Sequence, residues 1–355
     1  MSGFSLEATN PDNLNFGDNL LQTGYWARVK SRFAWQPFAF YLTPSFGPIV
    51  SALSGGVTET APLLILVRKV APGIMLAYCP HGPDVKVEDP WEFLSWLRKE
   101  LNDYLPKGCA LLRFDLPWGK GPPSATTSGY SLPRKSPVDV QAPDTVILEI
   151  EPDLEKVLSQ MKSKTRYNIR LSARRGVSVR DGLPGDLDIW HGLAQETSRR
   201  DGIAIHSRRY FEALFDESRG PADPDVRLLI AEVNGKPVAA NIISIQGRRC
   251  IYHFGASSNE ERNKMPTYAL QWEGIRVAKL AGCATYDLFG IPPTRDPSHP
   301  MHGLYQMKVG FGGKVTHRPG CYDFPLNRAT YGAYTTAERL RTIFLAAKKH
   351  RLRRQ

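Results

Sequence analysis

The side chains of this sequence that are best suited to chemistry are basic and clustered. One short span carries seven of them: Lys162, Lys164, Arg166, Arg170, Arg174, Arg175 and Arg180. Like charges at this density oppose folding unless an anion lies nearby, and the phosphates of a nucleic-acid backbone would supply one. A solvated helix face is the alternative. The span therefore predicts either phosphate binding or an exposed basic helix.

The charge of the whole chain agrees with this local excess. The 355 residues carry a net charge of +11, and the pI is near 9.4. A surplus of this size favours polyanionic partners, among them nucleic acid, nucleotide diphosphates and an anionic membrane face. Charge alone does not choose between them.

No pattern of a nucleophilic or metal-dependent enzyme accompanies the charge. The sequence contains no Ser-His-Asp or Cys-His spacing, and its histidines lack the spacing of metal ligands. The five cysteines are widely separated, form no CxxC pair and lie mostly in apolar contexts: Cys79, Cys109, Cys250, Cys283 and Cys321. We expect buried structural thiols and no metal site.

The elements that must position these groups fill more than one domain. A chain of 355 residues with 42% hydrophobic and 23% charged residues has an ordinary globular composition and is long for one core. No apolar run approaches the roughly 20 residues of a membrane helix. The N-terminus lacks the basic and then apolar pattern of a signal peptide. We expect two domains in a cytoplasmic monomer.

The clearest structural unit lies in the second half of the chain. A β-type run, Cys250–Phe254, breaks at Gly255, and Pro266 stands where a helix could start. Apolar residues then recur at helical spacing as far as Gly282, and a strand is predicted for Thr285–Ile291. The result is a β-loop-α-β unit, whose loops are common places to hold a ligand.

Three predicted strands precede this unit, at residues 225–232, 236–246 and 248–254, with a hairpin signal at Asn234-Gly235. An antiparallel meander that leads into a β-loop-α-β unit is the order of a GNAT-like acyltransferase. The first half has similar content, with strands at 61–70, 74–78 and 109–117 and a helix at 91–104. We predict an α/β (α+β) protein of two GNAT-like domains, each a mixed sheet flanked by helices. The first comprises residues 1–144 with 322–355, and the second residues 145–321.

The segment before the central helix argues against coenzyme A. In GNAT-like enzymes that use this cofactor, a glycine-rich loop offers backbone N–H groups to the pyrophosphate. Here Arg262–Thr267 contains no glycine, and Pro266 lacks an N–H donor. Acetyl-CoA is therefore a poor candidate, and we expect no cofactor.

Several motifs together resemble one family. In chain order they are Gln22–Lys30 (QTGYWARVK), Lys164–Arg170 (KTRYNIR), Gly255-Ala256-Ser257, Asn259, Pro266, Tyr268, Gln271-Trp272, Tyr286–Ile291 (YDLFGI) and Lys308–Gly313 (KVGFGG). This order is similar to that of the Fem family, the aminoacyl-tRNA-dependent transferases that form peptidoglycan bridges. The chain has no heptad-patterned segment for the helical hairpin of longer members, so it resembles the short form.

The resemblance implies roles for residues that bind the acceptor. Lys30 would help to hold the diphosphate of the precursor, and Tyr78, in a Tyr-x-Pro-x-Gly-Pro turn, would reach the ligand. His206 stands where relatives tend to have a phosphate-binding arginine before Tyr210, so Arg208 or Arg209 would have to substitute for it. Tyr252 and Tyr268 would line the acceptor-peptide channel. On the residues alone, Lys30 fits a solvated basic face, Tyr78 a plain turn, and the last two tyrosines half-buried aromatics.

The resemblance also implies catalytic and tRNA-binding residues. Lys308 would meet the tRNA acceptor end or the developing negative charge, and Asp287 would orient or deprotonate the incoming amine. Lys164, Arg166, Arg170 and Phe311 would contact the tRNA. The alternatives are a surface lysine before a glycine turn and an aspartate that caps a loop.

The implied reaction is aminolysis of the aminoacyl-tRNA ester, with UDP-MurNAc-pentapeptide or lipid II as acceptor. Two other functions stay open: a GNAT-like N-acyltransferase with another donor or acceptor, and a non-catalytic RNA-binding protein. A basic C-terminal helix, predicted for Thr335–Arg354, could touch tRNA or make peripheral contact with an anionic membrane.

Overall fold

A computed structural model describes residues 3–119 and 132–352, with side chains as far as Phe344. The chain forms two compact units, Met1–Pro143 with His317–Gln355 and Asp144–Thr316. The chain thus re-enters the first unit at His317, a little before the expected residue 322. Arg353 and Arg354 lie outside the described residues.

The first unit is built on a seven-stranded mixed sheet of order β1-β2-β5-β6-β7-β16-β8. Its strands are β1 (Phe4–Thr9), β2 (Gln36–Pro44), β5 (Ala61–Ala71), β6 (Ile74–Cys79), β7 (Cys109–Leu116), β8 (Arg134–Lys135) and β16 (Gly320–Pro325), and β3 (Ile49–Val50) and β4 (Val57–Thr58) form a separate pair. Its helical elements are η1 (Pro11–Asn13), η2 (Leu20–Gln22), α1 (Gly24–Ser31), α2 (Pro90–Leu101) and α9 (Arg328–Leu352). Leucines of α2 pack with residues of β5, β7 and β16 in one core.

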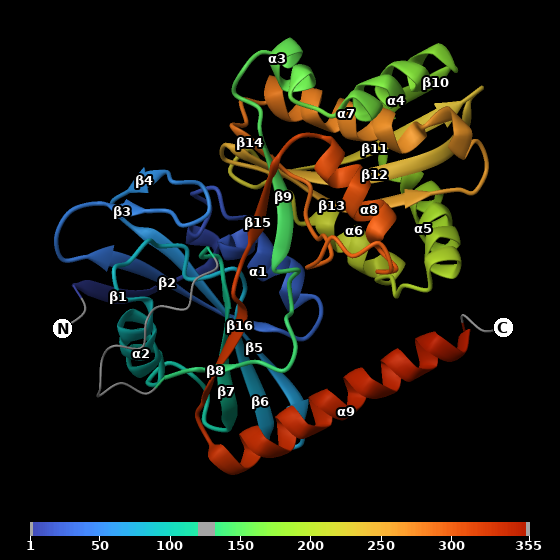
Figure 1. The fold of residues 1–355 in the computed structure, drawn as a ribbon. Coiled ribbons are helices and arrows are strands. Elements are labelled where there is room, and N and C mark those ends of the chain that lie inside the picture. Colours follow the sequence, from blue (N-terminus) through green and yellow to red (C-terminus); the bar gives the residue numbers. More distant parts are fainter. Residues whose placement is uncertain (1–2, 120–131, 353–355) are drawn as a thin grey trace. The chain divides into compact units, whose positions relative to one another are not determined.

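The second unit has a sheet of order β10-β11-β12-β13-β14-β9-β15. Its strands are β9 (Asp144–Glu149), β10 (Val177–Asp181), β11 (Asp225–Val233), β12 (Lys236–Gln246), β13 (Arg249–Ser257), β14 (Thr285–Asp287) and β15 (Lys314–His317). Its helical elements are α3 (Leu154–Ser159), α4 (Ser163–Arg174), η3 (Pro184–Asp186), α5 (Leu187–Asp201), α6 (Arg208–Asp216), η4 (Arg262–Lys264), α7 (Pro266–Leu280) and α8 (His302–Gly310). Helices α4 and α7 cover one face of the sheet, and α5 and α6 cover the other (Figure 1).

The two units share one central arrangement. In each, an antiparallel meander ends in a strand that pairs in parallel with the next one along the chain, β6 with β7 and β13 with β14. A helix joins each parallel pair, α2 in the first unit and α7 in the second. The expectation of two α/β units with mixed sheets flanked by helices is confirmed.

Other sequence expectations can be compared with the described residues. Each of the five cysteines is buried, as predicted. Among the described residues, no helix is long and apolar enough to cross a membrane, and no cluster of possible metal ligands occurs.

Candidate functional site

The candidate site lies in the second unit where β13 and β14 part. Their parallel pairing ends at Ile251 and Asp287, while β13 continues to Ser257. The Lys308 ammonium lies at this divergence, 3.1 Å from the carbonyl oxygen of Phe289 and 2.8 Å from that of Gly290. Lys308 is only 5% exposed, and burial lowers its pKa to about 7, although the Asp287 charge opposes this shift. A buried lysine with such a pKa at a strand divergence is typical of a functional group.

The glycines after Lys308 explain how α8 reaches this position. A Cβ at Gly310 would lie 2.4 Å from Thr165 Oγ1, and one at Gly313 would lie 2.6 Å from the carbonyl oxygen of Ile147. At Gly312 the φ angle is +88°, and a Cβ would lie 2.4 Å from the carbonyl oxygen of Gln160. Only glycine permits these approaches. The KVGFGG motif therefore packs the end of α8 against α4, the α3–α4 turn and β9.

Asp287 shapes the loop whose carbonyls receive the Lys308 hydrogen bonds. Its carboxylate is fully buried, accepts a hydrogen bond from Thr145, pairs with Arg249 and accepts from the backbone N–H of Phe289 at 2.8 Å. The last bond holds Phe289 at a φ of +55°. Both carboxylate oxygens are thus engaged, Oδ1 by Thr145 and Phe289 and Oδ2 by Arg249. These contacts favour the loop-acceptor alternative for Asp287 over deprotonation of an amine.

The three aromatic residues predicted for this site are held by ring contacts, one of them with the buried lysine. The Tyr252 ring centroid lies 5.2 Å from the Lys308 ammonium, and burial raises the tyrosine pKa to about 12. Tyr268 stacks on Phe311 with 5.9 Å between ring centroids. Phe311 is 1% exposed, so it is a core residue, and the expectation that it contacts tRNA directly is not supported.

Sequence reasoning missed His253 beside this site. The registers of β12 and β13 shift here, because Ile242 faces Phe254 while Ile243 faces Tyr252. His253 is therefore the extra residue of a bulge, a device that re-aims side chains. Burial lowers its pKa to about 4, so the imidazole is neutral. A histidine inside an apolar strand is too common in sequences to have singled it out.

The predicted tRNA-binding run lies mainly on α4. Lys164 and Arg170 are exposed, as is Tyr167, which lies 5.8 Å from the guanidinium of Arg174. Arg166 is half-buried and donates to the carbonyl oxygens of Met161 and Ser159, so it caps α3. The structure thus leaves a narrower exposed basic face than the sequence suggested. We call Lys164, Tyr167, Arg170 and Arg174 the α4 basic face.

In the first unit, Lys30 lies in a second cationic cluster. Burial and the nearby Arg68 charge lower its pKa to about 8, and its ammonium lies 4.8 Å from the centre of the Trp26 ring. The guanidinium of Arg68 lies 4.6 Å from the centre of the Trp35 ring. Two close cations favour an anion between them. Arg68 was not predicted, although a charge that ends the apolar run of β5 was a visible signal.

Tyr78 lies close to this cluster but is fixed by other contacts. Its ring is 6.1 Å from Trp35, its side chain is 2% exposed, and its hydroxyl donates to Asp115 at 3.0 Å. Burial raises the pKa of both the Tyr78 hydroxyl and the Asp115 carboxyl, the latter to about 6. These contacts favour a supporting role for Tyr78 over direct ligand contact.

His206 and Tyr210 stack on each other, with ring centroids 4.0 Å apart and an interplanar angle of 18°. His206 is exposed, whereas Tyr210 is buried, which raises the tyrosine pKa. Arg208 points elsewhere, because its guanidinium pairs with Asp188 at 2.7 Å and also with Glu212. The structure therefore brings His206 and Tyr210 together and does not support Arg208 as a phosphate ligand.

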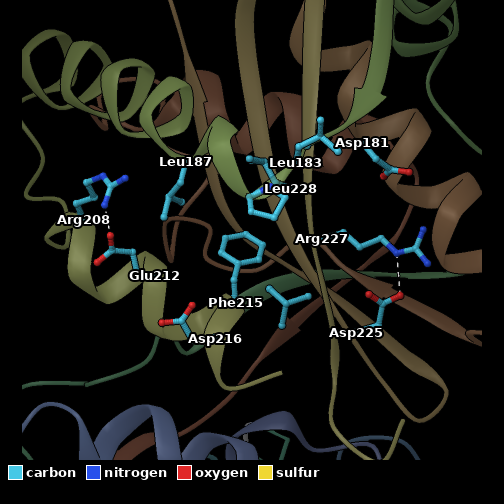
Figure 2. A pocket seen from close by; sticks show the side chains of 13 residues that line it. Asp181, Leu183, Leu187, Arg208, Glu212, Phe215, Asp216, Asp225, Arg227 and Leu228 are labelled. Atoms are coloured by element: carbon cyan, nitrogen blue, oxygen red, sulfur yellow. Dashed lines mark hydrogen bonds and ion pairs between the residues drawn. The ribbon is translucent and has the colours of Figure 1, made fainter. Parts of the chain in front are cut away.

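Arg208 borders a hollow of about 640 Å³ between α6, η3 and β11 (Figure 2). Four carboxylates line it, from Asp181, Glu212, Asp216 and Asp225, against the two guanidinium groups of Arg208 and Arg227. Arg227 pairs with Asp225 across its edge, 2.7 Å apart. This excess of acidic groups argues against a phosphate site here.

Comparison with known proteins decides the family. The model of the FemAB family matches residues 132–236 and 226–339, which together span more than half of the chain. The chain belongs to the FemAB family. The resemblance seen in the sequence is confirmed, and the matched FemAB region includes β13, the YDLFGI loop and Lys308.

Curated relatives of this FemAB chain are similar at low identity. The Lipid II:glycine glycyltransferase of Staphylococcus epidermidis (strain RP62A) is 21% identical over 253 residues, which are 54% of this chain and 60% of that protein. The enzyme of the same name from Staphylococcus aureus (strain USA300) is 22% identical over 256 residues, which are 54% of this chain and 61% of that protein. The chain thus spans about three fifths of the length of these relatives.

A solved structure shares the fold over a longer stretch. The crystal structure of FemX aligns with a TM-score of 0.74 and 19% sequence identity, covering 93% of this chain and 100% of that one. The two-unit α/β architecture is therefore that of a known FemAB-type fold.

Proposed function

We propose that this chain transfers an amino acid from an aminoacyl-tRNA to the stem-peptide amine of a peptidoglycan precursor, forming an interpeptide bridge. The observation that carries the proposal is the buried Lys308 at the divergence of β13 and β14. The names of its FemAB relatives, lipid II:glycine glycyltransferases, support the acceptor class.

The reaction needs no covalent enzyme intermediate. The amine nitrogen bonds to the ester carbonyl carbon, the bond from that carbon to the ribose oxygen breaks, and the proton lost by the nitrogen passes to that ribose oxygen, which leaves as a hydroxyl. The enzyme must chiefly orient the amine and stabilise the oxyanion of the tetrahedral intermediate.

Lys308 is suited to stabilise that oxyanion. Of its three N–H donors, the carbonyls of Phe289 and Gly290 take two within the described part of the chain, which leaves one for an ester oxygen. A charged donor in a site that excludes water acts strongly on developing negative charge. Because its pKa is about 7, the lysine contributes less as the pH rises through that value.

The two substrates meet different basic surfaces in this proposal. The α4 basic face would bind the tRNA backbone, with Tyr167 available for stacking. In the first unit, Lys30 and Arg68 would hold the diphosphate that UDP-linked and lipid-linked precursors share. Acetyl-CoA is not proposed as donor. The segment that leads into α7 contains no glycine, and the first residue of α7 is Pro266, which has no backbone N–H to offer a pyrophosphate.

A transfer assay tests the proposal. The protein is mixed with tRNA charged with a pool of radiolabelled amino acids and with UDP-MurNAc-pentapeptide or lipid II, with and without RNase. We expect RNase-sensitive label in the muropeptide. Absence of label in both acceptors, with tRNA binding intact, would replace this proposal by another acyltransferase activity or by plain RNA binding.

A matched pair of lysine variants tests the role of Lys308. Lys308→Ala is expected to lower kcat by about 10²–10³-fold while tRNA affinity stays near that of the parent protein. Lys279 also donates to two backbone carbonyls, those of Ile150 and Glu151, at 3.2 and 3.0 Å. Lys279→Ala should therefore keep its activity. Equal loss in both variants would reduce Lys308 to a structural lysine.

A further inference from the structure

The C-terminal helix α9 has two different faces. One face packs on its own sheet through Tyr331, Thr335 and Glu338. The buried Arg113 of β7 fixes it there, because its guanidinium donates to Glu338 at 2.8 and 2.9 Å and to Asp323 at 2.7 and 3.0 Å. Among the side chains that the structure describes, packing ends at Glu338, and every residue from 339 to 344 is exposed. Figure 1 shows α9 continuing past β6 and β7.

The exposed part of α9 carries a continuous apolar stripe. Leu340, Ile343 and Phe344 are 62%, 65% and 69% exposed. Their i, i+3, i+4 spacing places them on one side of the helix, and a rotation of about 100° per residue puts that side opposite Thr335 and Glu338. We call these three residues the α9 stripe. Adjacent exposed apolar side chains of this kind mark an interaction surface.

Basic residues frame the stripe. Arg339 and Arg341 are exposed and fall about a quarter-turn to either side of its centre. The sequence of the same helix continues with Lys348, Lys349 and Arg351. An apolar strip flanked by arginines and followed by further cations is the pattern of a helix that lies in the interface of an anionic membrane.

We propose that the α9 stripe docks on an anionic lipid bilayer, with its apolar side chains at the acyl boundary and its basic residues among the headgroups. RNA would account for the charge but would leave Leu340, Ile343 and Phe344 in water. A second copy of the chain would cover the apolar strip but would bring like charges together on both sides of it. Anionic lipid satisfies both features, and the proposal does not depend on the transfer reaction.

Sedimentation of the full chain with vesicles tests the proposal. We expect binding to vesicles of equal parts phosphatidylglycerol and phosphatidylcholine, and little binding to phosphatidylcholine alone. The triple variant Leu340→Ser, Ile343→Ser, Phe344→Ser should lower the partition constant about tenfold or more. The double variant Arg339→Gln, Arg341→Gln should lower it by about fivefold per charge at low salt, and less at high salt.

Matched controls separate the stripe from general surface effects. Phe46→Ser removes a 92% exposed aromatic side chain elsewhere, and Arg248→Gln with Arg276→Gln removes the same charge from the second unit. Both should bind vesicles like the parent chain. Equal binding to both vesicle types, or undiminished binding by the triple variant, overturns the proposal. If the chain formed a dimer that depends on the α9 stripe and did not bind vesicles, the surface would be assigned to a second copy of the chain instead.

Discussion

At the scale of one residue, the burial that suits Lys308 to the proposed reaction also lowers the stability of the folded protein. Its ammonium is removed from water, and the described contacts return two hydrogen bonds to carbonyls and one aromatic ring. Burial lowers its pKa from 10.5 to about 7, which means that the fold disfavours the charged form. Each unit of pKa change corresponds to about 1.4 kcal/mol. A lysine buried at such a cost is better explained by chemistry than by packing.

This cost leads to a prediction for Lys308→Met. Between about pH 7 and 10.5 the unfolded chain holds this proton and the folded chain does not, so the free energy of unfolding of the parent protein rises with pH there. Below pH 7 the folded protein bears the full free-energy cost of burying the charged lysine. The variant should therefore be more stable by roughly 1–3 kcal/mol at pH 6, after the loss of two hydrogen bonds, with less advantage at pH 9.

Urea unfolding of both proteins at pH 6 and pH 9 measures this difference. Lys279→Met is the control for the loss of a lysine that donates to two carbonyls, because Lys279 is half-buried rather than enclosed. Destabilisation by Lys308→Met that is the same at both pH values would contradict the assignment.

At the scale of elements, α8 owes its position to the glycines that follow it. Gly312 has a φ of +88° and leaves no room for a Cβ beside Gln160, whereas a Cβ at Gly303 would meet nothing within 4 Å. Gly312→Ala should lower the free energy of unfolding by about 1–3 kcal/mol, since both backbone and neighbour must shift. Gly303→Ala, within the same helix, should be neutral or stabilising by up to about 1 kcal/mol.

Thermal unfolding and the transfer assay together test this element. Gly312→Ala should also lower kcat, because a shift of α8 moves Lys308 from the carbonyls that orient it. If Gly312→Ala and Gly303→Ala behaved alike in both measurements, the glycines would not position the lysine.

The sequence predicted elements well where one periodicity dominates. The strand at 236–246 was placed at its observed bounds, and the helix starting at Pro266 was also expected. Three errors have local causes. The strand expected to break at Gly255 continues to Ser257, because Gly255 still pairs with Asn241 of β12. The strand at 285 ends at Asp287 because that carboxylate turns the chain. Helix α8 was missed because its glycines mask a helical pattern.

Site residues were less predictable, because spacing along the chain does not reveal burial. The sequence identified Lys308 through its motif, but not the enclosure that lowers its pKa. It assigned tRNA contact to Phe311, which lies in the core, and a phosphate to Arg208, which two carboxylates engage. His253 became visible only when the pairing of β12 with β13 was known, whereas Arg68 had a signal in the sequence, the charge that ends the apolar run of β5.

At the scale of the whole molecule, the two α/β units use the same central arrangement for different tasks in the proposed function. The second unit holds the candidate catalytic lysine, and the first carries Lys30, Arg68 and the α9 helix. If the α9 stripe holds the first unit on anionic lipid, the chain meets a lipid-linked acceptor by diffusion in two dimensions. Membrane capture should then raise the apparent affinity for lipid II without altering the chemical step.

Assays with lipid II in vesicles and in micelles separate membrane capture of the enzyme from the chemical step. With lipid II in phosphatidylglycerol vesicles, the triple variant Leu340→Ser, Ile343→Ser, Phe344→Ser should show an apparent KM raised about tenfold, because it loses the stripe that concentrates the enzyme at the surface. With lipid II in neutral detergent micelles, variant and parent should have the same kcat and KM. Phe46→Ser should match the parent in both. A variant impaired equally in vesicles and micelles would mean that α9 supports the fold of the first unit rather than its access to the membrane.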